Sequence, residues 1–237
     1  MTLLRARVLE LLSAGAAKGV VEALEPAFAA ELGVMLHATF GAVGAIREAL
    51  DRGAACDVVV LTAAMIDALA DEGRVRRDTV AALGRVRTGV AVADEETYPE
   101  IGDAGELRAS LLAATAIYFP DPERATAGIH FVKVLRALGV YDTVAARLRP
   151  YPNGARAMRA LADAHLAGAI GCTQVTEILY TPGVTLVATL PREFELATVY
   201  AAAVASIARL PDDARRFVEW LTGPRSHAVR RAGGFEE

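Results

Sequence analysis

Four short turns rich in small and polar residues could bind a ligand through their backbone. They are residues 13–18 (SAGAAK), 39–44, 124–128 and 171–176. Each lies where an apolar run that predicts a strand meets the start of a predicted helix. The first N–H groups of a helix have no partner within it, and such groups bind anions without any charged side chain. These positions therefore predict an anion-binding protein.

Lys18 adds a cation to the first of these turns, and it is one of only two lysines, with Lys133. A lysine in the first turn of a helix meets the positive end of the helix dipole, which costs about 0.3–1 kcal/mol. A bound anion would remove this conflict. The alternative is that the side chain extends into solvent at small cost. The sequence leaves both interpretations open.

The histidines and cysteines match no metal or nucleophile motif. His37 falls in a predicted strand and His165 and His227 on charged helices, none with a partner at metal-ligand spacing. The two cysteines, Cys56 and Cys172, lie in apolar surroundings; we expect buried free thiols, with a disulfide as the alternative. Phosphate-loop, dinucleotide and nucleophile-elbow motifs are missing from the sequence. We expect no metal and no cofactor.

His130 differs from the other histidines because it lies two residues after the TAG turn at 126–128, near the start of a helix. That position suits a neutral, hydrogen-bonding role, and a packing role is the alternative.

The composition is that of an ordinary globular protein. The chain has 237 residues, 54% apolar and 23% charged, with a net charge of −4. No basic run suggests nucleic acid as a partner, and no stretch is apolar and long enough to span a membrane. No leader is visible, so we expect a cytoplasmic protein, or a periplasmic one if a leader has been removed.

Apolar runs alternate with amphipathic stretches in the first third of the chain, which predicts a parallel sheet covered on both faces. A second α/β region follows, so we expect an α/β fold. A polar, proline-containing stretch at 94–106 predicts a linker or surface excursion. The segment 198–208 is ambiguous, but its first residues favour a strand. Strands are expected at 7–12, 34–40, 57–61, 85–93, 116–119, 169–175 and 184–190. Helices are expected at 16–32, 45–53, 63–73, 106–114, 129–139, 141–148, 155–168, 212–223 and 224–234.

The order of these segments resembles the type II periplasmic solute-binding fold, in its molybdate-binding-protein-like branch, over nearly the whole chain. The resemblance is carried by LSAGAAKGVVEALEPAFAAELG, TFGAVGAIREALDRGAACDVVVL, DPERATAGIHF, GAIGCTQVTEIL, PGVTLVATLP and RRFVEWLTGPRSHAVRRAGG. It implies two α/β lobes joined by two crossover strands, RVRTGVAVA and the stretch near LPREFELA, with a ligand cleft between the lobes. Lobe one would be 1–86 plus 192–237, and lobe two would be 87–191.

The resemblance also implies a set of ligand-binding positions. The positions at which molybdate binders carry hydroxyl groups hold Ala16 and Val43, and the family's tyrosine aligns with Gln174. These departures favour an organic anion, above all a carboxylate, over a tetrahedral oxyanion. If the protein is a binding protein of this kind, the expected partner is an ABC permease. The expected ligand-binding residues are Ser13, Gly15, Ala16, Lys18, Thr39, Gly41, Val43, Thr126, Ala127, Gly128, Ala155, Arg156 and Gln174.

Some members of this branch are similar to aconitate isomerase, so an isomerase of an unsaturated di- or tricarboxylate is the alternative function. A proton shift needs acid/base groups within reach of the substrate carbon. The candidates are Lys18, His130 and Glu177, with Arg156 as a carboxylate clamp. The competing interpretations are a solvated helix residue for Arg156 and a capping or salt-bridge residue for Glu177. A third possible function is a sensor domain that acts through a separate partner chain.

Overall fold

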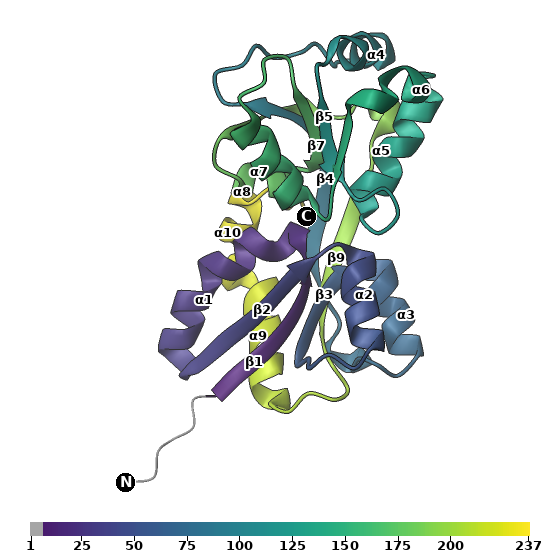
Figure 1. Ribbon diagram of the computed structural model, residues 1–237. Helices are drawn as coiled ribbons and strands as arrows, with labels where there is room; N and C mark the ends of the chain where they lie inside the picture. Colours follow the sequence, from purple (N-terminus) through teal and green to yellow (C-terminus); the bar gives the residue numbers. More distant parts are fainter. Residues whose placement is uncertain (1–6) are drawn as a thin grey trace. The chain divides into compact units, whose positions relative to one another are not determined.

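The computed structural model describes residues 7–237 and divides the chain into two compact units (Figure 1). The expected start of lobe one and the expected lack of a leader involve residues 1–6, which lie outside the described residues. Unit 1 contains the chain up to Gly41, Ile46–Arg85 and Val199–Glu237, and unit 2 contains Ala42–Ala45 and Val86–Thr198. The two long crossings between the units occur within β4 (Ala81–Ala93) and β9 (Ala197–Val204).

The sheet of unit 1 has the strand order β2-β1-β3-β9. Its first three strands are parallel, with Ser13 opposite both Phe40 and Val60, and β9 runs antiparallel to β3. Apart from β9, the elements of this unit have the following bounds: β1 (Arg7–Ala14), η1 (Gly15–Ala17), α1 (Lys18–Leu32), β2 (Val34–Gly41), α2 (Val43–Asp51, whose first residues are grouped with unit 2), β3 (Val58–Thr62), α3 (Ala63–Asp71), η2 (Arg77–Thr79), α9 (Pro211–Thr222), η5 (Pro224–Ser226) and α10 (His227–Ala232).

Helices cover both faces of this sheet, α1 and α9 on one side and α2 and α3 on the other (Figure 1). The α1 side is closed by aromatic packing: the Phe28 ring lies 4.9 Å from Phe217 and 5.6 Å from Trp220, both edge-on. Edge-to-face pairs of this kind add about 0.5–1.5 kcal/mol beyond the burial of their area. Helix α1 ends at Gly33, whose φ of 62° is the left-handed conformation that glycine adopts without strain.

Buried Asp57 connects three segments of unit 1. Its side chain is 1% exposed, and its carboxylate accepts the backbone N–H groups of Glu10, Arg209 and Leu210, at 2.9, 2.5 and 3.3 Å. Arg209 and Leu210 directly precede α9, so this carboxylate holds the segment that leads into that helix against β1.

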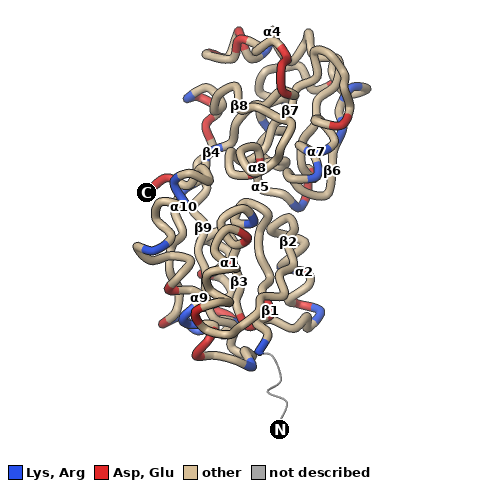
Figure 2. Tube along the Cα trace, turned by 90° about the vertical axis from the view of Figure 1, so that its left-hand side faces the viewer, with Lys and Arg blue, Asp and Glu red and all other residues tan. Residues whose placement is uncertain are grey.

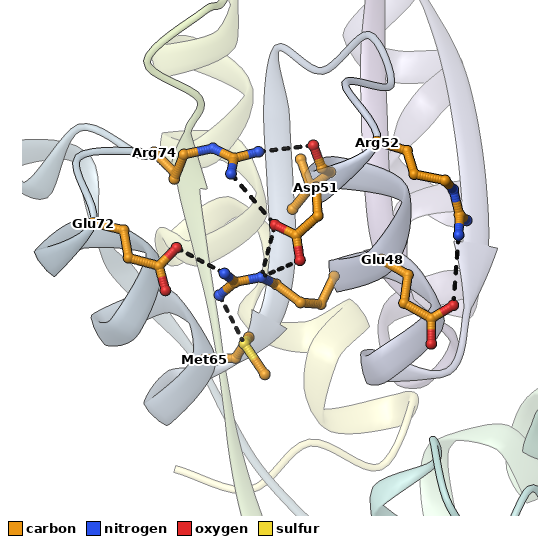
Figure 3. Close-up of polar contacts among 8 residues, drawn as sticks. Glu48, Asp51, Arg52, Met65, Glu72 and Arg74 are labelled. Atoms are coloured by element: carbon orange, nitrogen blue, oxygen red, sulfur yellow. Dashed lines mark hydrogen bonds and ion pairs between the residues drawn. The ribbon is translucent and has the colours of Figure 1, made fainter.

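The ends of α2 and α3 are joined by an exposed ion-pair network (Figure 3). The Arg47 guanidinium contacts Asp51 at 3.0 Å and Glu72 at 2.7 Å, and Arg74 contacts Asp51 at 3.3 Å. Arg47 holds the pKa of Asp51 below its usual value. Because these charges are mutually paired, the network explains the charged residues of this surface without a ligand.

The sheet of unit 2 has the strand order β4-β7-β5-β6, and β8 pairs with β4. Strand β5 is parallel to both β6 and β7, whereas β4 is antiparallel to β7 and β8. The further elements of this unit are α4 (Ala104–Ala113), β5 (Ile117–Pro120), α5 (Thr126–Ala137), α6 (Tyr141–Val144), η3 (Ala145–Arg147), β6 (Leu148–Tyr151), α7 (Gly154–Ala164), β7 (Ile170–Gln174), α8 (Val175–Tyr180), β8 (Val184–Thr189) and η4 (Arg192–Phe194).

Two apolar clusters form the core of unit 2. One joins Ile117 and Phe119 of β5 to Phe131 of α5, and the other joins Tyr118 of β5 to Met158 of α7. Because successive side chains of a strand point to opposite faces, α5 and α7 cover opposite faces of this sheet. Their first turns nevertheless begin at the same edge, where the parallel strands end.

The alternating α/β pattern is confirmed, and the ambiguous segment at 198–208 is a strand, β9. Both cysteines are free and buried, as expected. Other expectations were wrong. The helix expected over 141–148 ends early, because the chain tightens into η3 and then forms the missed strand β6. Helix α8 was missed behind β7, α5 starts three residues earlier than expected, and His165 is the left-handed C-cap of α7 rather than part of it.

Replacing Asp57 by alanine is expected to lower the free energy of unfolding by about 3 kcal/mol, because it leaves buried N–H groups without an acceptor. Urea unfolding of the variant measures this loss. Asp67→Ala, at an exposed position of α3, is the control and should stay within about 0.5 kcal/mol of the parent. Equal effects of the two changes would contradict the role given to Asp57.

Candidate functional site

In unit 1 the first predicted turn runs from the end of β1 through η1 into α1. Ser13 is fully buried and its hydroxyl donates to the carbonyl of Ala14 at 3.0 Å, so this side chain turns back to its own strand. Ala16 is also buried, whereas Gly15 is half-buried. Neither η1 nor α1 has a side-chain cap or an acidic residue in its first turn. The N–H groups of this turn therefore remain the feature that could bind an anion.

Lys18 begins α1 and is paired within unit 1. Its Nζ lies 3.7 Å from Glu22 Oε1, one turn along the helix, and 5.8 Å from the centroid of the Phe40 ring. These contacts moderate the conflict with the helix dipole that the sequence predicts. The side chain is 31% exposed, so it combines partial burial with access to solvent.

The second predicted turn follows β2. The Thr39 side chain is exposed, and Gly41 and Val43 are half-buried. The N–H of Gly44 donates to the carbonyl of Arg124 at 3.0 Å. Residues 42–45, which are grouped with unit 2, therefore contact the loop that leads into α5.

In unit 2 the turn before α5 is ordered by an aspartate. Asp121 Oδ1 accepts the N–H groups of Glu123 and Arg124, at 2.8 and 2.9 Å. Helix α5 then begins after Ala125, with no side-chain cap and no acidic residue in its first turn. The predicted residues Thr126, Ala127 and Gly128 are the first three residues of this helix, where N–H groups lack partners within the helix.

Gly128 is required by packing. A Cβ atom at this position would lie 2.2 Å from the carbonyl oxygen of Asp121 and 2.3 Å from that of Pro120. The first turn of α5 thus lies directly against the end of β5, closer than any side chain would allow.

Helix α7 differs from α5 because its first turn is capped from within unit 2. Asn153 Oδ1 accepts the N–H of Arg156 at 2.9 Å. The Glu177 carboxylate accepts the N–H groups of Gly154 and Ala155, and it accepts the Thr173 hydroxyl at 2.6 Å. The predicted donor at Ala155 therefore already has an acceptor, and the Arg156 side chain is exposed. Their assignment to a ligand stays a prediction.

Glu177 is a buried carboxyl group, 6% exposed. Burial raises its pKa, because the charged form loses its hydration, and the hydrogen bonds from Thr173, Ala155 and Gly154 act in the opposite direction. The capping role that the sequence offered as the alternative for Glu177 is therefore what its contacts show. Sequence reasoning missed Thr173, because it lies on β7 whereas Glu177 lies on α8, and no helical spacing links the two residues.

Gln174 lies at the end of β7 beside polar groups that sequence reasoning missed. It pairs in register with Thr88 of β4, and its Nε2 donates to Thr198 Oγ1 at 3.4 Å. Among residues 7–237, the buried side-chain atoms without a hydrogen-bond partner are Thr88 Oγ1, Gln174 Oε1 and Thr176 Oγ1. Buried polar atoms normally have partners, so this cluster marks the end of β7 as a polar position within an otherwise apolar sheet.

His130 is half-buried in α5, and its Nε2 lies 2.7 Å from the carbonyl oxygen of Phe194. A carbonyl only accepts, so Nε2 carries the proton and a neutral imidazole keeps Nδ1 as an acceptor. The ring thus connects α5 to the last residue of η4.

No group of three or more His, Cys, Asp and Glu side chains within residues 7–237 is arranged to hold a metal ion. In that same range no helix has the length and apolarity needed to cross a membrane.

Basic and acidic residues are interspersed along the trace rather than gathered by sign (Figure 2). An open groove of unit 2 is lined by Gly102, Asp103, Pro191, Arg192 and Glu193, and it contains none of the predicted site residues.

Thr88→Val keeps the shape of the side chain and removes its unpaired hydroxyl. We expect the free energy of unfolding to rise by about 1 kcal/mol, or about 2–4 °C in the melting temperature of the ligand-free protein. Thr181→Val is the control: this buried hydroxyl donates to the Glu177 carbonyl at 2.7 Å, so its loss should destabilise. A fall in the melting temperature of Thr88→Val would show that its hydroxyl has a partner in solution.

Glu177→Gln should change how stability depends on pH. The folded-state pKa of Glu177 is raised above its ordinary value of 4.5. The folded state therefore binds more protons than the unfolded state between these two values, and its stability falls as pH rises through that interval. Glutamine does not titrate, so the melting temperature of the variant relative to the parent should rise with pH above about 4.5. Exposed Glu219→Gln is the control, and a flat difference for Glu177→Gln would refute the assignment.

The sequence is similar to those of known proteins. The chain is 27% identical over 222 residues to the aconitate isomerase of Pseudomonas sp, covering 90% of this chain and 81% of that protein. It is 29% identical over 126 residues to the molybdate-binding protein ModA of Escherichia coli K12. That alignment covers 53% of this chain and 48% of ModA, so the chain spans about half the length of that relative.

Solved structures show the same fold. The periplasmic molybdate-binding protein of Azotobacter vinelandii matches with a TM-score of 0.81 at 19% identity, covering 97% of this chain and 99% of that one. The sulfate-binding protein SubI of Mycobacterium tuberculosis matches with a TM-score of 0.75 at 17% identity, covering 97% and 86%. The expected two-lobe type II fold, in its molybdate-binding-protein-like branch, is confirmed. Over residues 9–236 the sequence matches the family described as bacterial extracellular solute-binding protein, and the chain belongs to this family.

Proposed function

We propose that this solute-binding protein binds a small organic anion, most directly a carboxylate, through backbone N–H groups at the starts of its helices. The observation that carries this proposal is the contrast among the long helices of unit 2, α4, α5 and α7. Asp103 caps α4, and Asn153 with Glu177 cap α7, whereas α5 begins without a side-chain cap. An uncapped first turn presents several N–H groups and the positive end of the helix dipole, which suits a carboxylate.

Unit 1 offers a turn of the same kind. Helix α1 follows η1 without a side-chain cap or an acidic residue in its first turn, and Lys18 places a cation there. A cation at this position is unfavourable for the helix alone and becomes favourable when an anion is bound. Lys18 is therefore the side chain of unit 1 that we propose contributes to anion binding.

The ligand class follows from which side chains surround these turns. The positions at which the family resemblance expects hydroxyl groups hold Ala16 and Val43. Gln174 provides an amide that can both donate and accept, and its Oε1 has no partner. Fewer hydroxyl donors and an amide acceptor suit a carboxylate that carries a further polar group better than a tetrahedral oxyanion.

The partner that we propose is an ABC permease, with the periplasm as the compartment. A related solved structure is described as the substrate-binding domain of a putative molybdenum ABC transporter of Clostridium difficile, with a TM-score of 0.68 at 16% identity, covering 97% of this chain and 98% of that one. Membership of the extracellular solute-binding family supports the same assignment.

A thermal-shift screen tests the ligand class, with mono-, di- and tricarboxylates beside molybdate, tungstate, sulfate and phosphate. A ligand at a hundred times its dissociation constant stabilises the protein by about 2.7 kcal/mol, or on the order of 5–10 °C for a chain of this size. We expect a carboxylate to give this shift. A shift with molybdate or tungstate alone would contradict the proposed ligand class.

Thr126→Pro tests the N–H groups of α5 directly. Proline is tolerated at the first position of a helix and removes one N–H, and Ala125 already has the extended backbone that a residue before proline requires, with φ −98° and ψ 127°. We expect its dissociation constant for the carboxylate to rise about tenfold, as for loss of a charge-assisted hydrogen bond. Thr126→Ala separates the hydroxyl from the N–H, and Ala104→Pro makes the same change on α4. Both controls should bind like the parent.

An isomerase of an unsaturated carboxylate is the second candidate function, favoured by the 27% identity to aconitate isomerase over 90% of this chain. Glu177, His130 and Lys18 are the acid/base groups available to it. Proton NMR of a carboxylate that gives a thermal shift, recorded in deuterium oxide, decides between the functions. Loss of the signal of an exchangeable allylic proton with conversion to an isomer identifies the enzyme, and an unchanged spectrum identifies a binding protein.

A further inference from the structure

The first turn of α7 is already occupied by a carboxylate that belongs to the protein itself. Glu177 accepts the N–H groups of Gly154 and Ala155, and Asn153 accepts that of Arg156. These are the first three N–H groups of α7, which an external anion would otherwise use. The side chain of Glu177 is 94% buried, as its 6% exposure shows, so it is a fixed part of the site.

Two neighbouring residues are shaped around this carboxylate. A Cβ atom at position 154 would lie 1.9 Å from Glu177 Oε2 and 2.0 Å from Thr173 Oγ1, so only glycine allows the carboxylate to reach the helix. Thr173 donates to the same oxygen at 2.6 Å. The fit of Gly154, Thr173 and Glu177 shows a built arrangement and excludes a chance contact.

This arrangement lies at the same sheet edge as the uncapped turn of α5. Strand β5 is parallel to β6 and to β7, and Pro120 at its end lies opposite Tyr151 at the end of β6. Helix α5 follows β5 and α7 follows β6. Two helix starts therefore face the edge at which ligands bind in parallel sheets, and the protein's own carboxylate fills one of them.

We infer that Glu177 determines ligand specificity by acting as an internal anion, which occupies the N–H groups of α7 and leaves the first turn of α5 as the anion-binding turn of unit 2. This inference rests on the proposed function of anion binding, and it specifies which anions should bind weakly. A ligand with one carboxylate for α5 meets no competition. A tetrahedral oxyanion, which needs donors from several directions, loses the donors of α7 and meets a carboxylate instead.

Isothermal titration of Glu177→Ala with sulfate and with molybdate tests the inference. Removing the carboxylate frees the two N–H groups and leaves room for an oxyanion. We expect the dissociation constant for these oxyanions to fall at least tenfold relative to the parent. Affinity for a monocarboxylate should change less than threefold, because its turn on α5 is untouched. Oxyanion binding as weak as that of the parent, in a variant with a cooperative thermal transition, would overturn the inference.

Two further variants keep the test decisive. Glu177→Gln removes the charge but retains an acceptor for one N–H group, so it preserves the fold if Glu177→Ala does not. Its affinity for oxyanions should rise at least threefold over that of the parent. An unchanged affinity would overturn the inference. Asp103→Ala removes the carboxylate that caps α4 at 2.9 Å. It should gain no oxyanion affinity, and an equal gain there would show that any uncapped helix binds these ions.

The outcomes for specificity and for function are separable. If the parent binds no carboxylate but Glu177→Ala gains oxyanion binding, the proposed function fails and the specificity role of Glu177 stands. If the parent binds a carboxylate and neither Glu177 variant gains oxyanion affinity, the function stands and the specificity role fails.

Discussion

The need of each helix for acceptors at its first turn is the constraint on which this structure depends. Parallel strands feed helices whose starts gather at the strand ends, and each start brings N–H groups that the helix cannot satisfy. Side chains cap the starts of α3, α4 and α7, whereas α1, α5, α6, α8, α9 and α10 begin without a side-chain cap. The acceptors come from Thr62 for α3, Asp103 for α4, and Asn153 with Glu177 for α7. Asp57 holds the two residues that precede α9.

The same constraint explains the small residues that attracted attention in the sequence. Gly128 and Gly154 both lie where a helix starts against backbone or carboxylate oxygens, at separations that no Cβ atom could occupy. Each glycine therefore allows its helix to start closer to these oxygens than a residue with a side chain could. At Gly154 the acceptor is Glu177. At Gly128 the close contact is with carbonyl groups of the preceding strand and turn, and the N–H groups of that helix start have no side-chain cap.

Most of the fold could be predicted because continuous apolar strands and amphipathic helices have different periods. The failures have local causes. Strand β6, LRPY, contains a proline and an arginine and pairs only with β5, so it carries no strand signal of its own. Helix α8 is six residues long with valine and threonine at its start, which read as a continuation of β7. The Glu177 cap and the unpaired oxygen of Thr88 depend on contacts between distant segments, which periodicity does not contain.

Binding and isomerisation make opposite demands on Glu177. As a cap it must stay with Gly154, Ala155 and Thr173, whose hydrogen bonds hold the carboxylate in place. As an acid or base it would have to leave these donors at each turnover and expose two buried N–H groups. His130 faces less conflict, because Nε2 is fixed to the Phe194 carbonyl while Nδ1 keeps its lone pair. If proton transfer occurs on this scaffold, the hydrogen bonds of the free protein favour His130 over Glu177 as the base.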